Sequence, residues 1–311
     1  MLTHLIILLD DTSTSYCHYE VTKVERRLIG LDDLKAGIRF AMKENLNTQF
    51  VYPDYKLPVK YLETIDSIDH AKVMPSTCCE EADVVVLSDW DGKAPQGGTC
   101  IIRTNHESLN HHLPVVKDWL SKINRLNIVL TDVETFKDDA VNNYRNTLEM
   151  LSDVIAECYK SGSFVQLNLL TDRLMLTGMN NCNAGVSNIT LAPNGRFYLC
   201  PAYYYENETD SVGDPKDGLD IRNQQVLRLD HAPLCRLCDA YQCKRCIWQN
   251  QHLTLDVNTP SHQQCVVAHI ERNASRTLLA KLKEKGVTQR GSHEIEKIDY
   301  LDPFNILNKW K

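Results

Sequence analysis

Apolar and polar positions change period repeatedly along the first half of the chain. Short apolar runs rich in β-branched residues predict strands, and longer amphipathic runs between them predict helices. The expected strands cover Leu5–Leu9, Phe50–Tyr52, Asp83–Ser88, Cys100–Arg103, Asn127–Val133 and Phe164–Leu170. The expected helices cover Leu34–Leu46, Leu113–Ile123 and Asp139–Lys160. This alternation is typical of βα units that build a mostly parallel sheet.

The helical period is strongest between residues 139 and 160. Apolar residues there follow one another at steps of four, three, four and three, which places them on one face of a helix. They are Tyr144, Leu148, Leu151, Ile155 and Cys158. We therefore expect this face to be buried.

The pattern changes near residue 172. Two short apolar runs, Ile189–Ala192 and Arg196–Cys200, flank Asn194 and Gly195 and predict a hairpin, because Asn-Gly suits the positive φ angles of a tight turn. A helical period returns over Val267–Glu284. The second half of the chain therefore differs in architecture from the first.

Composition narrows the class of protein. The 311 residues are 43% apolar and carry a net charge of −7, which argues against sequence-independent binding of nucleic acid. The apolar run Leu5–Leu9 is followed at once by Asp10 and Asp11, unlike a signal peptide. No segment approaches the roughly eighteen apolar residues of a membrane span. We expect a cytoplasmic protein with neither a membrane nor a nucleic acid as partner.

The cysteines are distributed unevenly. Of twelve, seven lie between positions 182 and 265, and clustered cysteines in a reducing compartment indicate a metal site or catalysis. The seven are Cys182, Cys200, Cys235, Cys238, Cys243, Cys246 and Cys265. This stretch is therefore predicted to bind metal.

Two cysteine pairs stand only four residues apart. Cys235 and Cys238, like Cys243 and Cys246, are separated by two residues, a gap that lets two thiolates meet one centre. Four thiolates satisfy one zinc ion or one 4Fe-4S cluster. Seven cysteines exceed one such site and favour two clusters, while a single structural zinc is the alternative. Composition alone does not choose between zinc and iron–sulfur.

The spacing resembles the SPASM domain of radical SAM peptide-modifying enzymes. The first part of the SPASM pattern is matched by Cys182, a twelve-residue gap, Gly195 and Cys200. The two cysteine pairs follow, with spacings slightly shorter than in the pattern, and Cys265 matches its final cysteine. The resemblance implies one 4Fe-4S cluster on Cys235, Cys238, Cys243 and Cys265, and another on Cys182, Cys200 and Cys246. The second of these lacks a fourth cysteine. His231 and His269 are candidates for that ligand, although each is more often an ordinary histidine.

The N-terminal region departs from the radical SAM pattern. Such an enzyme carries C-x3-C-x2-C after its first strand, whereas this chain reads DDTSTSYCHYE and holds only Cys17. Whether Cys17 stands for the second or the third cysteine of that motif, the loop lacks the other two thiols. S-adenosylmethionine is therefore not expected as a cofactor. Asp10 and Asp11 either bind a cation or a substrate amine, as groups at strand ends do in α/β sheets, or form a solvated strand end.

Across nearly its whole length the chain resembles the CXXX repeat peptide maturase family, radical SAM-like proteins with a SPASM-type region but without the AdoMet-cluster motif. The segments that carry the resemblance are LIILLDDTSTSYCHYE, FAMKENLNTQFVYPDY, LAPNGRFYLCPAYYY, DHAPLCRLCDAYQCKRCIW and QQCVVAHIERNASR. It implies an α/β fold, a degenerate partial (β/α) barrel over residues 1–172. A SPASM-like iron–sulfur domain over 173–268 and a helical tail over 269–311 would follow.

The resemblance also implies a function, namely maturation of a ribosomally made peptide with a cysteine at every fourth position. A reductant or a partner radical SAM enzyme would assist it, and no residue is assigned as catalytic. Two alternatives stay open. One is a non-catalytic peptide-binding chaperone with a structural zinc or cluster, and the other is an atypical radical SAM enzyme.

Overall fold

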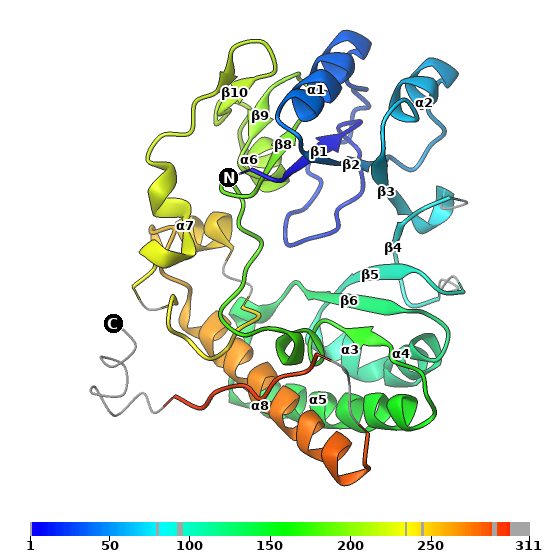
Figure 1. Cartoon of the computed structure of the whole chain (residues 1–311), viewed down its shortest axis with the longest axis vertical. Coiled ribbons are helices and arrows are strands. Elements are labelled where there is room, and N and C mark those ends of the chain that lie inside the picture. Colours follow the sequence, from blue (N-terminus) through cyan, green and yellow to red (C-terminus); the bar gives the residue numbers. More distant parts are fainter. Residues whose placement is uncertain are drawn as a thin grey trace. The chain divides into compact units, whose positions relative to one another are not determined.

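A computed structural model describes residues 2–78, 81–91, 96–233, 235–243, 246–287 and 291–298, which form two compact units (Figure 1). The first unit comprises Met1–Lys93, Gly98–Arg103 and Asn183–Leu227. The second comprises Ala94–Gly97, Thr104–Cys182 and Arg228–Lys311. Each unit is therefore assembled from separate stretches of sequence. The domain boundaries expected at residues 172 and 268 stay predictions, and residues 299–311 of the expected tail lie outside the described residues.

A mostly parallel sheet forms the centre of the first unit. Its strands lie in the order β5-β4-β3-β2-β1-β8-β9, and every neighbouring pair is parallel except β8 with β9. They are β1 (His4–Leu8), β2 (Asn47–Val51), β3 (His70–Pro75), β4 (Val84–Leu87), β5 (Thr99–Thr104), β8 (Asn188–Leu191) and β9 (Phe197–Tyr198). The expected α/β class with a mostly parallel sheet is confirmed; closure toward a partial barrel stays a prediction.

Strand β1 is buried because it pairs on both sides. Ile7 lies opposite Phe50 of β2 and opposite Leu191 of β8, and all three side chains are fully buried. Central parallel strands bury both faces, which explains the continuous apolar run in the sequence. The end of β1 therefore places the residues that follow it at the carboxyl edge of the sheet.

The predicted hairpin is confirmed. Strands β8 and β9 pair antiparallel, with Leu191 opposite Phe197. Gly195 in the turn has φ 76°, and a Cβ atom there would lie 2.9 Å from Cγ of Asp33. Only glycine tolerates both the positive φ angle and the close approach of Asp33 without strain. A second short hairpin follows from β10 (Gly213–Asp214) and β11 (Gly218–Leu219).

Helices of the first unit are short apart from one. They are α1 (Leu31–Lys43), α2 (Val59–Ile65) and α6 (Pro201–Glu206), with 3-10 turns at Ser76–Cys78 and Gln224–Leu227. Helix α1 approaches the sheet closely at Gly37, where a Cβ atom would lie 2.3 Å from a methyl of Leu191. The absence of a side chain at Gly37 thus sets the contact between α1 and the sheet.

The second unit is dominated by two long helices that pack against each other, α5 (Asp138–Lys160) and α8 (His262–Glu284) (Figure 1). Its other elements are α3 (His106–His111), α4 (Leu113–Leu120), α7 (Ile247–Thr254), the parallel strands β6 (Arg125–Leu130) and β7 (Gln166–Leu167), and 3-10 turns at Val133–Thr135, Asp172–Met175 and Leu229–His231. The predicted apolar face of α5 is buried at Tyr144, Leu148, Leu151 and Ile155, whereas Cys158 on the same face is only half-buried.

Two sequence expectations differ from the structure. The strand expected over Phe164–Leu170 is reduced to β7, because the chain turns at Leu167, whose N–H and carbonyl both bond to the hydroxyl of Thr171. Strand β3 was not expected from the sequence. Val73 is its one buried residue, so the strand carries no alternating apolar signal.

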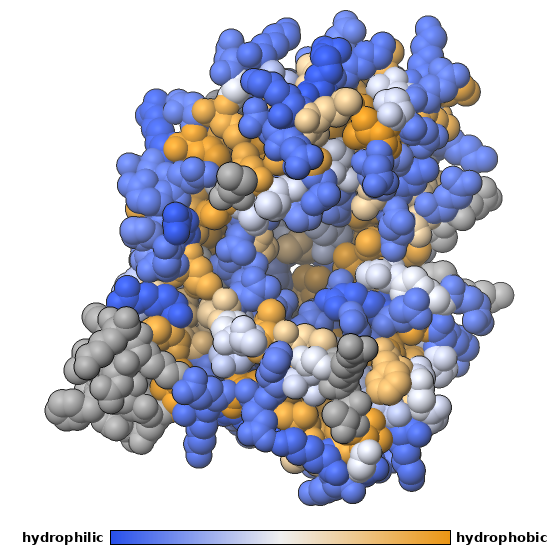
Figure 2. Space-filling model, in the orientation of Figure 1, coloured by the Kyte–Doolittle hydropathy of each residue, from blue (hydrophilic) through white to orange (hydrophobic). Residues whose placement is uncertain are grey.

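The face shown in Figure 2 is mostly hydrophilic, with smaller areas of hydrophobic residues between the charged ones. Within the described ranges, no helix combines the length and the apolar character that crossing a membrane requires.

Candidate metal centre

Four cysteines lie close together in the second unit. Burial raises the pKa of the Cys243 thiol to about 12, and interactions with Cys235, Cys238 and Cys265 contribute in the same direction. Burial and Cys238 likewise raise the pKa of Cys265. Cys235 and Cys243 are only 5% and 8% exposed. Cys235, Cys238 and Cys265 therefore lie near enough to Cys243 to influence its thiol, and Cys238 and Cys265 are half-buried.

The loop that carries three of these cysteines is folded by its own backbone. The Cys238 N–H donates to the Cys235 carbonyl at 3.0 Å, which closes a turn around the first pair. The Ala240 N–H points to Sγ of Cys238 at 3.4 Å. Tyr241 adopts a left-handed conformation with φ 52° and reverses the chain before Cys243. Amide donors near sulfur suit a thiolate that carries negative charge.

Arg173 holds this loop in place. Its guanidinium donates to the carbonyls of Ala240 at 3.0 Å and Gln242 at 2.5 Å, on either side of the reversed residue. It also pairs with Glu271 at 2.5 Å, and Glu271 accepts a further bond from Tyr144 at 2.6 Å. Arg173 and Glu271 are 1% and 2% exposed. A fully buried ion pair therefore holds the cysteine loop against α5 and α8.

Helix α8 presents a polar face to the same loop. Cys265, His269, Arg272 and Arg276 follow at steps of four, three and four, so they share one side of the helix. Asp239 is buried at 1% exposed and pairs with both arginines, with 3.1 Å between its carboxylate and Arg276. Since both carboxylate oxygens are bonded, Asp239 serves to dock the loop on α8.

His269 lies beside the thiol site. Its Nε2 atom is 3.5 Å from Sγ of Cys238, and burial, followed by the charge of Arg272, lowers its pKa. A neutral imidazole can bind a metal through its unprotonated nitrogen. The sequence suggested His269 as a ligand for the other cysteine set, but the structure places it at this one.

Four cysteine thiols are the number and type of donor that a four-thiolate centre requires, and the ligand atoms of Cys238, Asp239 and His269 lie within 4.8 Å of one another. Zinc and a 4Fe-4S cluster each accept four thiolates, and the arginine charge nearby offsets part of the negative charge that such a centre carries. The ligand roles of the individual cysteines stay a prediction.

The three cysteines of the other expected set lie in different units. Cys200 precedes α6 in the first unit and is half-buried. Cys182 is exposed and Cys246 is half-buried, and both belong to the second unit. His231, the other suggested ligand, is exposed. The assignment of this set therefore stays a prediction from the resemblance.

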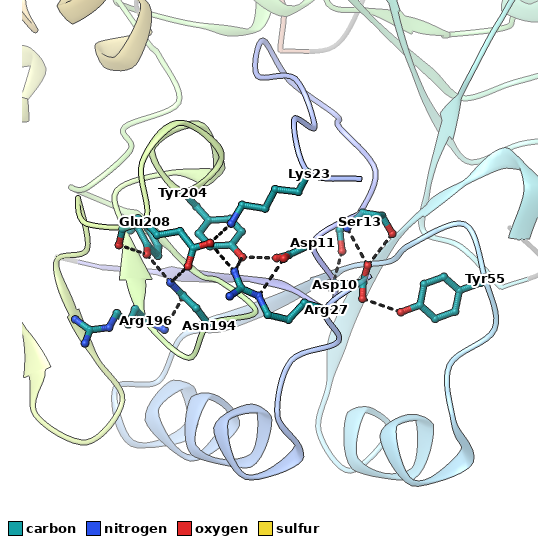
Figure 3. Close-up of polar contacts among 12 residues, drawn as sticks. Asp10, Asp11, Ser13, Lys23, Arg27, Tyr55, Asn194, Arg196, Tyr204 and Glu208 are labelled. Carbon is teal, nitrogen blue, oxygen red and sulfur yellow. Dashed lines mark hydrogen bonds and ion pairs between the residues drawn. The ribbon is translucent and has the colours of Figure 1, made fainter. Parts of the chain in front are cut away.

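The loop after β1 contains a buried carboxylate (Figure 3). Asp10 is fully buried. One carboxylate oxygen accepts from the N–H and hydroxyl of Thr12 at 2.9 and 2.7 Å, and the other accepts from the Tyr55 hydroxyl at 2.8 Å. Ser13 ties the same loop to β2 through the Val51 carbonyl at 2.8 Å.

Asp11 belongs to a second polar network beside the first (Figure 3). Its carboxylate pairs with Arg27 at 3.0 Å and accepts a hydrogen bond from the Tyr204 hydroxyl. Arg27 also pairs with Glu208 at 2.6 Å, and Lys23 pairs with Glu208 too. Burial alone would raise the pKa of Glu208, but the hydrogen bonds from Lys23 and Arg27 lower it to about 2.

These contacts exclude one of the two roles suggested for the acidic pair, and binding of a cation or a substrate amine stays a prediction. A solvated strand end is excluded, because Asp10 and Asp11 are 0% and 5% exposed and bonded. The residues do not fit the AdoMet cluster of radical SAM enzymes, since the loop offers one thiol, Cys17, and its carboxylates are engaged in protein contacts. No chemistry is therefore assigned to that cofactor here.

Several residues of the centre were not expected from the sequence. Arg173 and Glu271 are 98 positions apart and carry no local motif. The polar face of α8 was visible in principle as a repeat at Cys265, His269, Arg272 and Arg276. The apolar positions of the same helix dominate its pattern and mask that repeat.

The sequence matches no protein-family model and no curated protein. The structure is similar to that of hexahistidine-tagged anSMEcpe with bound AdoMet, with a TM-score of 0.57 and 14% sequence identity over 90% of this chain and 98% of that one. It is more weakly similar to SuiB from Streptococcus suis bound to the precursor peptide SuiA, with a TM-score of 0.42 and 13% identity over 67% of this chain and 62% of SuiB. The first likeness shows that this chain shares the mixed α/β fold of that protein; the second supports no conclusion about this chain.

Proposed function

We propose that this chain is a maturation protein for a ribosomally made peptide with regularly repeated cysteines. It would hold a 4Fe-4S cluster on Cys235, Cys238, Cys243 and Cys265. The proposal is supported by the burial of Cys235 and Cys243 and by the electrostatic influence of Cys235, Cys238 and Cys265 on the Cys243 thiol, in a chain with a radical SAM-like fold. The sequence resemblance supplies the peptide class.

A bound cluster would supply one-electron chemistry. The chain's own residues would set its environment. The Ala240 N–H would stabilise the Cys238 thiolate, and Arg173 and Glu271 would keep the loop in place. A second cluster on Cys182, Cys200 and Cys246 is part of the proposal.

Metal analysis after anaerobic purification tests the proposal. We expect about four irons and four sulfides per chain from the four-cysteine site, or about eight of each with the second cluster. Absorption of reduced and oxidised protein would show cluster redox activity. Iron without acid-labile sulfide would contradict the cluster assignment.

A structural zinc in a non-catalytic peptide-binding chaperone is the second candidate. The observation that favours it is His269, whose Nε2 lies 3.5 Å from Cys238, because structural zinc sites commonly combine cysteine and histidine ligands. About one zinc per chain, retained under air and without sulfide, would support this function over the first.

The loop after β1 predicts how the chain responds to S-adenosylmethionine. We expect no 5′-deoxyadenosine from the reduced, cluster-loaded protein, because Cys17 is the only thiol of the loop and Asp10 is buried in protein contacts. Chromatography of the products, with a radical SAM enzyme as positive control, measures this. Turnover that Cys17→Ala abolishes would instead support the atypical radical SAM alternative.

A further inference from the structure

A histidine and an aspartate meet where two neighbouring stretches of the second unit leave their strands. His106 begins α3 just after β5, and Asp132 follows β6. The Thr131 N–H donates to the Thr104 carbonyl at 2.9 Å, which holds the two stretches side by side. Asn105 caps α3 by accepting from the Ser108 N–H at 2.7 Å. Groups at the carboxyl ends of strands in α/β folds are well placed to meet ligands.

Asp132 fixes both the position and the tautomer of the imidazole. Its carboxylate accepts from the His106 backbone N–H at 3.2 Å and lies 2.5 Å from Nδ1. Because a carboxylate only accepts, Nδ1 carries the proton and Nε2 of the neutral ring is left with a lone pair. Among the residues that the structure describes, none forms a hydrogen bond with that Nε2 atom. The side chain of His106 is 14% exposed.

The pair of His106 and Asp132, here called the dyad, is connected to the metal centre through packed side chains of the same unit. The centroid of the Phe136 ring lies 4.7 Å from that of the His106 ring and 5.6 Å from that of the Tyr144 ring. Tyr144 bonds to Glu271, the partner of Arg173. The same packed side chains therefore contact both the dyad and the residues that hold the thiol-bearing loop.

A second connection leaves from the same turn after β6. Glu134, two residues beyond Asp132, accepts from Ser261 at 2.9 Å and from Gln264 at 3.1 Å. Ser261 caps α8 at the turn that carries Cys265. One short segment thus positions both the imidazole and the start of the metal-binding helix.

We propose that His106 is a proton acceptor for thiols of the bound peptide, with Asp132 as its positioning residue; the choice of substrate rests on the proposed function. In the step, a peptide S–H bond breaks, the proton moves to Nε2 of His106, and the electron pair stays on sulfur. The products are a thiolate and an imidazolium that Asp132 stabilises. No electron is transferred in this step, so no oxidant or reductant is required.

The first experiment measures thiolate formation directly. A synthetic peptide with a cysteine at every fourth position is bound to the cluster-loaded protein, and iodoacetamide alkylation of the peptide is followed by mass spectrometry at about pH 6.5. Free cysteine is mostly protonated at this pH, so we expect the wild type to accelerate alkylation of one peptide thiol about fivefold to tenfold. His106→Gln should lose the acceleration, while His111→Gln, an exposed histidine on the same helix, should keep it.

Two further readouts separate this proposal from the proposed function. Peptide binding, measured by fluorescence anisotropy, should be unchanged in His106→Gln; no binding to the wild type would sink the proposed function. The reactivity of the dyad is then measured with diethyl pyrocarbonate, which should modify His106 faster than His111. This difference should be lost in Asp132→Asn and restored in Asp132→Glu. Equal reactivity of the two histidines, or equal alkylation in wild type and His106→Gln, overturns the proposal.

Discussion

Replacing Cys235 or Cys238 by alanine is expected to remove both the metal and the folded second unit. Cys235 is 5% exposed and Cys238 contacts both Ala240 and His269, so the loop is built around these sulfurs. Metal binding and folding are coupled in such sites, and structural zinc contributes roughly 10–16 kcal/mol in small domains. We expect either variant to lose nearly all metal of this site and most soluble protein.

Controls come from cysteines elsewhere in the chain. Cys17→Ala changes the loop after β1 and should leave metal content unchanged, and Cys182→Ala should remove at most the second cluster. Iron, sulfide and zinc are measured per chain alongside the soluble fraction and the far-ultraviolet circular dichroism. Wild-type metal content in Cys235→Ala would refute the ligand assignment, and metal loss in Cys17→Ala would point to a centre in the first unit.

The sequence predicted regular elements best where burial produced a strong period. The face of α5 from Tyr144 to Ile155 and the hairpin at Gly195 both follow from local rules, one from helical spacing and one from turn geometry. Strand β3 escaped because only Val73 is buried in it. Local patterns therefore identify elements that bury a complete face and miss those that pair mainly through backbone.

The site was predictable to the same limited extent. Cysteine spacing predicted a metal-binding stretch, because metal ligands close together in the chain form a recognisable pattern, and the grouping of Cys235, Cys238, Cys243 and Cys265 stays a prediction from the resemblance. It did not identify Arg173 with Glu271 or His106 with Asp132, because those contacts join residues 98 and 26 positions apart. A single polar residue in sequence gives no sign of its partner, so only the fold shows which charges are paired.

Disruption of the buried ion pair beside the cysteine loop is expected to be the most costly change outside the thiols. Glu271→Gln removes the counter-charge of Arg173, which is 1% exposed, and weakens the bond from Tyr144. Breaking a buried ion pair from one side typically costs about 3–5 kcal/mol, because the remaining charge is left uncompensated. We expect Glu271→Gln to lose about that much free energy of unfolding and part of its metal.

A neighbouring ion pair supplies the matched control. Arg125 and Asp172 are 2.6 Å apart but 29% and 12% exposed, so solvent screens them. Asp172→Asn should cost about 1 kcal/mol or less and leave metal content intact, as judged by urea unfolding and metal analysis. Equal losses in the two variants would mean that burial does not set the cost. Full metal content in Glu271→Gln together with a large loss of stability would mean that Arg173 holds its loop without the help of its counter-charge.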